Sequence, residues 1–302
     1  MCAKQFDYNN SGELLRMLNK VMNNTCYRKK VSRSDRERGF TITELMITIA
    51  LSLSVIGSVL VGYMATYTSS MNTLAASRMN QDLNAVMGLI ITELRRAGYS
   101  GDAASATDPT TNVFNQFGST ALEVHDNMTA DNVLVSDLNN GWTNASSPAA
   151  TDGSCIVYAY DLDEDGVVDT NELGGFRLNS GAVEFRRLGN VANPNTCSST
   201  NNTWEALTDS DFITITALTF NLDASQCLNT REPNGVENGG DGGVIDDAPE
   251  FDCYDVAPLT SDITVETRQI DITITGNLTD DSFVTVSLNQ DVRVRNELVR
   301  VR

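Results

Sequence analysis

The feature that most constrains this chain is an uncharged run from Leu45 to Tyr67, which contains only apolar residues, Gly, Ser and Thr. A helix that spans a membrane needs roughly 20 such residues, so the run predicts one spanning helix. Six basic residues lie just before it: Arg28, Lys29, Lys30, Arg33, Arg36 and Arg38. The positive-inside rule therefore places the N-terminus in the cytoplasm and exports the rest of the chain. On these grounds alone, an uncleaved signal anchor is as good an interpretation as a processed signal.

The charge of the chain changes sign at the same place. Residues 1–39 hold nine Lys or Arg and four Asp or Glu, whereas the remainder holds twelve Arg, no Lys and 36 acids. Such asymmetry indicates that the two parts face different surroundings. The acidic body argues against a general phosphate-binding surface, so we predict no direct binding of nucleic acid.

The cysteines agree with export. Two precede the apolar run, and four follow it: Cys155, Cys197, Cys227 and Cys253. The spacing of these four resembles no zinc pattern, and oxidising compartments favour disulfides. Four cysteines allow three pairings. We predict Cys155–Cys197 and Cys227–Cys253, because sequential pairing closes the shorter loops; buried free thiols are the alternative.

The helical pattern continues beyond the membrane run as one apolar stripe with spacings of three and four. The stripe consists of Leu74, Met79, Leu83, Val86, Met87, Ile90, Ile91 and Leu94. It predicts an amphipathic helix over residues 68–99 that continues the spanning helix of residues 40–67. Gly98, followed by Gly101, is a plausible end for this helix.

From Cys155 onward the pattern is typical of β-structure. The β-branched and aromatic runs are residues 155–160, 175–178, 182–188 and 212–222. Residues 263–276 and 282–299 alternate apolar and polar side chains, which predicts a long C-terminal hairpin with one buried face. The predicted fold class is α+β: a long N-terminal helix whose second half packs on an antiparallel sheet in a head formed by residues 100–302.

The sharpest local motif is DLDEDGVVDTNE, Asp161 to Glu172, which fits the D-x-D-x-D-G-x5-E pattern of a calcium loop. In that pattern the ligands would be the side chains or carbonyl oxygens of Asp161, Asp163, Asp165, Val167, Asp169 and Glu172. The flanking runs are strands and not helices, so we predict a structural Ca²⁺ site and not a helix-opening sensor. The alternative is a solvated acidic turn.

Catalytic signals are weak. The only histidine, His125, has no nearby nucleophile motif, and the absence of Lys after residue 39 excludes Schiff-base and P-loop chemistry in that part. The patterns G-x-S-x-G, H-E-x-x-H and G-x-G-x-x-G do not occur. We therefore expect a protein that is not an enzyme.

The segment RGFTITELMITIALSLSVIGSVLVGY resembles the type III signal of type IV prepilins and type II secretion pseudopilins. In that family, a prepilin peptidase cuts after the glycine and N-methylates the new terminus. The resemblance implies that Gly39 is the last residue of a leader formed by residues 1–39 and that Phe40 starts the mature chain. Glu44 then matches the family's glutamate at the fifth mature position. Its carboxylate can pair with the N-terminal amine of a neighbouring subunit or with its own, because a paired carboxylate costs far less in lipid than an isolated one; the alternative is a carboxylate near the interface that lipid head groups solvate.

Within this family, the chain is most similar to the PilW-like minor pilins. The similarity rests on ELRRAGYSG at 93–101, FRLNSGAVEFRRLG at 176–189 and the strand-rich ending VRVRN at 292–296. It implies a minor pilin that primes pilus assembly at the inner membrane and lies at or near the filament tip. The implied partners are prepilin peptidase, other minor pilins, the major pilin and a tip adhesin. The head would be periplasmic before assembly and at the cell surface afterwards, in a filament that serves motility, adhesion or DNA uptake.

Two other functions remain open at this point. A minor pseudopilin of type II secretion would share the processing signal but serve export. A membrane-anchored, calcium-binding adhesive ectodomain would keep its leader.

Overall fold

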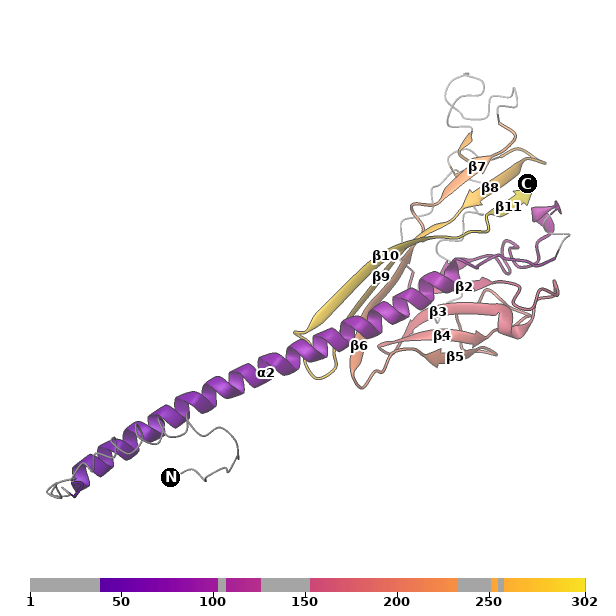
Figure 1. Ribbon diagram of the computed structural model, residues 1–302. Coiled ribbons are helices and arrows are strands. Elements are labelled where there is room, and N and C mark those ends of the chain that lie inside the picture. The colour runs from indigo at the N-terminus through magenta and orange to yellow at the C-terminus, as the bar shows by residue number, and fades with distance from the viewer. Residues whose placement is uncertain (1–38, 103–106, 126–152, 233–250, 255–257, 302) are drawn as a thin grey trace, which may run out of the picture. The chain divides into compact units, whose positions relative to one another are not determined.

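The computed structural model describes residues 39–102, 107–125, 153–232, 251–254 and 258–301. The chain divides into two compact units, Met1–Tyr63 and Met64–Arg302, each described by itself below. The first unit is represented by the beginning of a long helix. The second contains the rest of that helix and all the strands (Figure 1).

The helix α2 (Ile42–Leu94) has 53 residues and begins at a hydroxyl cap. The Thr41 hydroxyl accepts a hydrogen bond from the backbone N–H of Glu44 at 3.2 Å. Threonine is one of the residues preferred at the N-cap, because its side chain can accept such a bond from the first turn. The helix is followed by turns that lead to Gly98, whose φ of +73° is unfavourable for other residues. A Cβ at Gly98 would also lie 2.9 Å from the Asn115 side chain. The predicted long helix is therefore present, with ends shifted by a few residues.

The buried stripe on α2 is shorter than predicted. Its buried apolar residues are Met79, Leu83, Val86, Met87, Ile90 and Leu94. Leu74 was assigned to the stripe wrongly, since it is 66% exposed, and Ile91 is only partly buried. The reason is that packing against the core begins only at Ala75, at the next position along the helix. Periodicity in the sequence identifies the apolar face of a helix, but it does not show at which residue the rest of the protein begins to cover that face.

One antiparallel sheet of five strands follows the order β1-β2-β3-β4-β5. Its strands are β1 (Glu123–His125), β2 (Cys155–Ala159), β3 (Leu173–Asn179), β4 (Ala182–Leu188) and β5 (Thr203–Ala206). The loop Asp161–Glu172 connects β2 to β3 and ends in a short 3-10 helix, Thr170–Glu172. The first described residues after α2 lead to a second 3-10 helix, Pro109–Thr111.

Two three-stranded antiparallel sheets complete the second unit, with the orders β10-β9-β6 and β11-β8-β7. Their strands are β6 (Ile213–Asn221), β7 (Gln226–Asn229), β8 (Ile263–Thr267), β9 (Gln269–Leu278), β10 (Thr285–Arg293) and β11 (Leu298–Val301). One core cluster joins α2, the five-stranded sheet and the sheet β10-β9-β6. The predicted α+β fold, with a helix packed on antiparallel strands, is thus confirmed.

The predicted C-terminal hairpin is only partly right. Its central part exists, because β9 and β10 pair from Gln269↔Arg293 to Asn277↔Thr285. The chain, however, leaves this sheet at Arg268, so that β8 and β11 pair in a different sheet. The alternation of buried and exposed residues continues through Arg268, which is why periodicity did not reveal the change. The buried residues of β8 are polar, Thr264 and Glu266, whereas the buried side chains of β9 are apolar: Ile270, Ile272, Ile274 and Leu278.

Candidate functional site

The residues at the predicted cleavage site, Gly39 and Phe40, lie in non-helical backbone before α2. Phe40 is 79% exposed, and a Cβ at Gly39 would have no neighbour within 4 Å. A protease binds its substrate most readily in exposed, unpaired backbone. The bond between the two residues is therefore accessible, and the capped helix starts two residues beyond it.

Glu44 lies in the first turn of α2 and is exposed. A carboxylate at this end of a helix interacts favourably with the helix dipole. Its backbone N–H is bonded to Thr41, so the cap fixes the start of the helix but leaves the Glu44 side chain available. This is the position that an intersubunit ion pair would need.

By length and composition, α2 contains a stretch that could cross a membrane, and none of that stretch is buried within the chain. This is compatible with a single-pass inner-membrane anchor. Hydroxyls along α2 donate to helix carbonyls three or four residues earlier, in the manner that suits an apolar surrounding. These hydroxyls belong to Thr48, Ser52, Ser54, Ser58, Thr68, Ser70 and Thr73.

In the head, the loop between β2 and β3 brings together Asp161, Asp163 and Asp165, which offer carboxylate oxygens within 4.8 Å of one another. The Asp161 side chain is buried, and the other two are exposed. Gly166 has a φ of +76°, and a Cβ there would lie 3.2 Å from the Asp102 side chain. The loop therefore needs glycine at the sixth position of the predicted pattern.

The remaining predicted ligands are placed differently. Both oxygens of Glu172 accept backbone N–H groups, one from Leu162 at 2.7 Å and one from Asp169 at 2.8 Å. Glu172 is buried and thus ties the two ends of the loop together. Asp169 is the N-cap of the short 3-10 helix, and neither Asp169 nor Glu172 belongs to the group of three aspartates. The side chain of Val167 is exposed, and its carbonyl remains a predicted ligand.

The loop also holds the segment that follows α2. The backbone N–H of Gly98 donates to the Ala159 carbonyl at 2.8 Å, and that of Asp161 donates to the Tyr99 carbonyl at 2.9 Å. Asp161 Oδ2 accepts the N–H of Gly101 at 2.9 Å. In addition, the Tyr99 hydroxyl donates to Glu164 at 3.1 Å. The end of α2 is therefore fixed to the acidic loop through both backbone and side chains.

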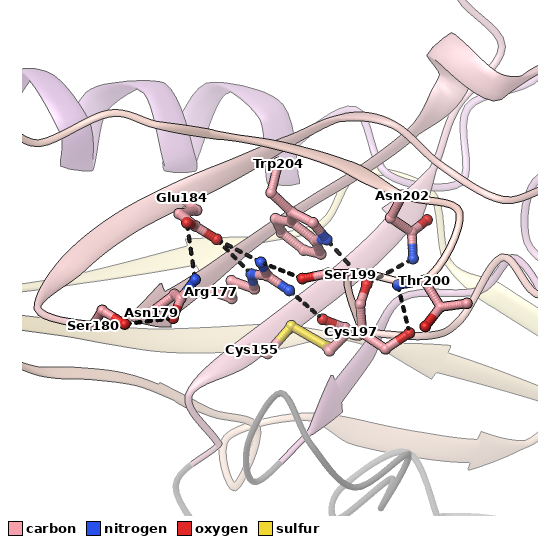
Figure 2. A network of polar contacts seen from close by, with 11 residues as sticks. Cys155, Arg177, Asn179, Ser180, Glu184, Cys197, Ser199, Thr200, Asn202 and Trp204 are labelled. Atoms are coloured by element: carbon pink, nitrogen blue, oxygen red, sulfur yellow. Dashed lines mark hydrogen bonds and ion pairs between the residues drawn. A yellow bond between two sulfur atoms is a disulfide. The ribbon is translucent and has the colours of Figure 1, made fainter.

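The structure contains the two disulfides in the predicted pairing, Cys155–Cys197 and Cys227–Cys253. The first ties β2 to the connection between β4 and β5. Around it lies a polar network centred on Arg177, shown in Figure 2, which the sequence interpretation did not include. The Arg177 guanidinium donates to Glu184 at 2.7 Å and to the Cys197 carbonyl at 2.7 Å, and it lies 4.1 Å from the centre of the Trp204 ring.

A second arginine, Arg186, is almost completely buried and was also missed. Its guanidinium donates to four carbonyl oxygens, those of Leu173, Gly174, Pro194 and Thr196. Burial lowers its pKa to about 9, so it stays protonated at neutral pH. The available signal was FRLNSGAVEFRRLG, in which both arginines occupy strand positions. We interpreted this run as strands and as a likeness to PilW-like minor pilins, but we did not expect its arginines to be buried, which is possible when their donors are all satisfied.

His125 is buried in β1, with Nε2 lying 3.8 Å from a Glu123 oxygen. Both side chains are buried within the five-stranded sheet.

The exposed apolar helix and the β-rich head together have the layout of a pilin-like protein. The model of the family described as prepilin peptidase-dependent protein B matches residues 72–294, and the chain belongs to that family. The match starts after Glu44, so it is independent of the signal at Gly39 and Phe40. The family description supports prepilin peptidase as a partner of the chain. No curated protein and no solved structure matches it.

Proposed function

We propose that the protein is a PilW-like minor pilin of a type IV pilus, which primes assembly at the inner membrane and lies at or near the filament tip. The observation that carries the proposal is the junction Gly39–Phe40, exposed directly before the capped start of α2, with Glu44 in the first turn. The family to which the chain belongs depends on prepilin peptidase, which supports cleavage at this bond.

Cleavage would leave an α-amine on Phe40, and Glu44 is the only acid between this residue and Tyr67. A carboxylate in lipid is expensive when isolated and much less so when paired. We therefore assign Glu44 to pairing with an N-terminal amine, either its own or that of a neighbouring subunit. Such a pair would fix the axial position of one subunit against the next.

The exposed apolar surface of α2 supports a filament role, because it can pack first against lipid and then against the helices of neighbouring subunits. At Gly57 and Gly62 an added Cβ atom would meet no other atom within 4 Å, so the helix surface is open there. Small residues such as glycine allow helices to approach closely. The partners that we propose are other minor pilins, the major pilin and a tip adhesin.

The head, residues 100–302, would face the periplasm before assembly and the cell surface afterwards. Its two disulfides support an oxidising location. We propose a structural role and not a catalytic one, since His125 is buried within a strand and its ring faces another side chain of the same sheet.

The deciding experiment is mass spectrometry of the N-terminus after extraction of the protein from cell membranes. We expect a chain that begins at Phe40 and carries one N-methyl group in cells with prepilin peptidase, and an uncleaved chain in cells without it. An intact leader in peptidase-positive cells would overturn the proposal and favour a membrane-anchored adhesive ectodomain.

The same processing would occur in a minor pseudopilin of type II secretion, which is the second candidate. Deletion of the gene separates the two, because loss of surface filaments indicates a pilus, and loss of protein export with normal filaments indicates secretion. If the intact gene restores the lost filaments or export in the deletion strain, and a Gly39 variant that resists cleavage does not, the phenotype depends on processing.

A further inference from the structure

Three carboxylates gather on one side of the loop between β2 and β3. Asp161, Asp163 and Asp165 each offer an oxygen within 4.8 Å of the others. Like charges at this spacing repel each other, and the repulsion is strongest where a group is removed from water. A positive charge among the oxygens would remove this repulsion.

A second observation points to a ligand at the same place. Asp161 is only 2% exposed, and its Oδ2 accepts N–H groups from Gly101 at 2.9 Å and from Gly166 at 3.2 Å. Its Oδ1 is also buried, but it has no hydrogen-bond partner among the residues that the structure describes. Buried carboxylate oxygens are normally satisfied, because a lost interaction is costly. A trapped water could satisfy this oxygen but would not offset three negative charges.

The geometry points to a calcium site formed by the carboxylates of Asp161, Asp163 and Asp165. The donors are all oxygens, which suits calcium, whereas zinc prefers nitrogen and sulfur. Two of the three side chains are exposed, so water can complete the six to eight ligands that calcium takes. Magnesium demands stricter octahedral geometry and gives up water reluctantly, so it fits less well.

The ligand set is smaller than the twelve-residue pattern predicts. Each oxygen of Glu172 accepts a backbone N–H, from Leu162 or from Asp169, so Glu172 closes the loop, and the site that we propose does not rely on it as a ligand. The site requires a closed loop, because closure brings the end of the loop at β3 back beside its beginning at Asp161.

The ion would also act on the end of α2. Asp161 contributes one oxygen to the segment after the helix, through Gly101, and the other to the ion. Calcium that immobilises this side chain therefore stabilises the hydrogen bond to Gly101 and the backbone bond between Asp161 and Tyr99. This inference does not depend on the proposed role in pilus assembly, since it concerns the head alone.

The test uses the full chain in detergent micelles, freed of metal with a chelator. Calorimetric titration with calcium chloride should show one saturable site, and magnesium chloride should bind much more weakly. Asp163→Asn and Asp165→Asn change exposed side chains, so they should fold normally yet weaken calcium binding by roughly tenfold or more, because ligand charge sets the affinity of such loops. Asp291→Asn, an exposed acid on β10, is the matched control and should bind as the parent does.

Three results would overturn the site. These are no saturable binding by the parent chain, unchanged binding by both Asp163→Asn and Asp165→Asn, or an equal loss with Asp291→Asn, which would indicate a diffuse counterion effect. Hydrogen exchange tests the coupling separately: calcium should slow exchange at the Gly101 amide in the parent and not in Asp163→Asn. Binding without slower exchange there would refute the coupling.

Discussion

The carboxylate of Asp161 accepts a hydrogen bond from the backbone N–H of Gly101, which lies sixty residues earlier in the chain. This bond joins the segment after α2 to the loop between β2 and β3. Two backbone bonds at Gly98 and Tyr99 run beside it. A force or a ligand that acts on this loop therefore also acts on the end of the helix.

The buried arginine of β4 should contribute strongly to stability. Arg186→Leu removes the donors for four carbonyl oxygens, so we expect a loss of about 3 kcal/mol or more in the free energy of unfolding, since each unsatisfied buried group is costly. The neighbouring Arg187→Ala breaks only an exposed ion pair with Glu205 and should leave the free energy of unfolding almost unchanged, because water screens such pairs. Thermal unfolding followed by near-ultraviolet circular dichroism compares the two. Equal effects would show that burial of Arg186 is unimportant.

Stability should fall at alkaline pH because of buried tyrosines. Burial raises the pKa of Tyr158, Tyr160 and Tyr254 above the ordinary value of 10.0. In the unfolded chain these groups lose their protons from about pH 10, so the folded state binds more protons and stability is lost as pH rises from there through the raised values. Below pH 10 this contribution is fully present.

The measurement is phenolate absorbance together with denaturant unfolding at several pH values above 9. Tyr158→Phe should reduce the steepness of the decline, because one buried phenol is removed while the ring remains stacked near Phe176. Ionisation of all tyrosines in the still-folded protein near pH 10 would contradict the prediction.

Processing can be monitored through the distribution of amines. Every lysine of the chain lies in residues 1–39, so a chain cut after Gly39 has one amino group, on Phe40. After N-methylation that group is a secondary amine, and we expect no reaction with reagents specific for primary amines. Ser282→Lys, placed in the exposed turn before β10, is the positive control for labelling. Labelling of the mature parent chain would show that methylation is absent.

Glu44 should matter for assembly and not for cleavage. Glu44→Gln keeps the size of the side chain but removes its charge, and the loss of one partner from a desolvated ion pair costs several kcal/mol, so we expect on the order of tenfold fewer surface filaments. Thr43→Ala, at the neighbouring exposed position, is the control. Filaments are counted by electron microscopy in a deletion strain that carries each variant. Normal filament numbers with Glu44→Gln would rule out the pairing role, whatever the state of processing.

The long helix could be deduced from the sequence, because its apolar periodicity and the glycine after it involve residues that are close together in the chain. The pairing of the cysteines was predicted from the lengths of the loops that it closes, and the structure has the same pairing. Strand β4 was predicted with its observed bounds, Ala182–Leu188. The start of the buried stripe on α2 was misplaced at Leu74, since covering depends on where distant strands lie. The same limitation hid the change of sheet at Arg268, where the alternation continues but a different partner strand takes over.

For the acidic loop too, the sequence predicted some features of the structure and missed others. Its sequence identified Asp161, Asp163 and Asp165, which the fold brings together. It also assigned Glu172 to a ligand position, which stays a prediction, but it did not reveal that each oxygen of this side chain accepts a backbone N–H. The N–H groups of Leu162, Asp169 and Gly101 meet these carboxylates only because the backbone folds back on itself, and the local sequence does not show this fold. Arg177 and Arg186 were missed for a related reason, because an arginine in a strand suggests exposure unless its acceptors are known.

The hydroxyls of α2 that bond to their own helix have one more consequence. Thr48, Ser52, Ser54 and Ser58 each donate to a carbonyl of their own helix, so these hydroxyl donors need no partner on a neighbouring subunit. This part of the helix can therefore move between lipid and protein surroundings without breaking the hydrogen bonds of these four hydroxyls. In the filament that we propose, Glu44 is the one acid between Phe40 and Tyr67, so its pairing would set the axial position of a subunit.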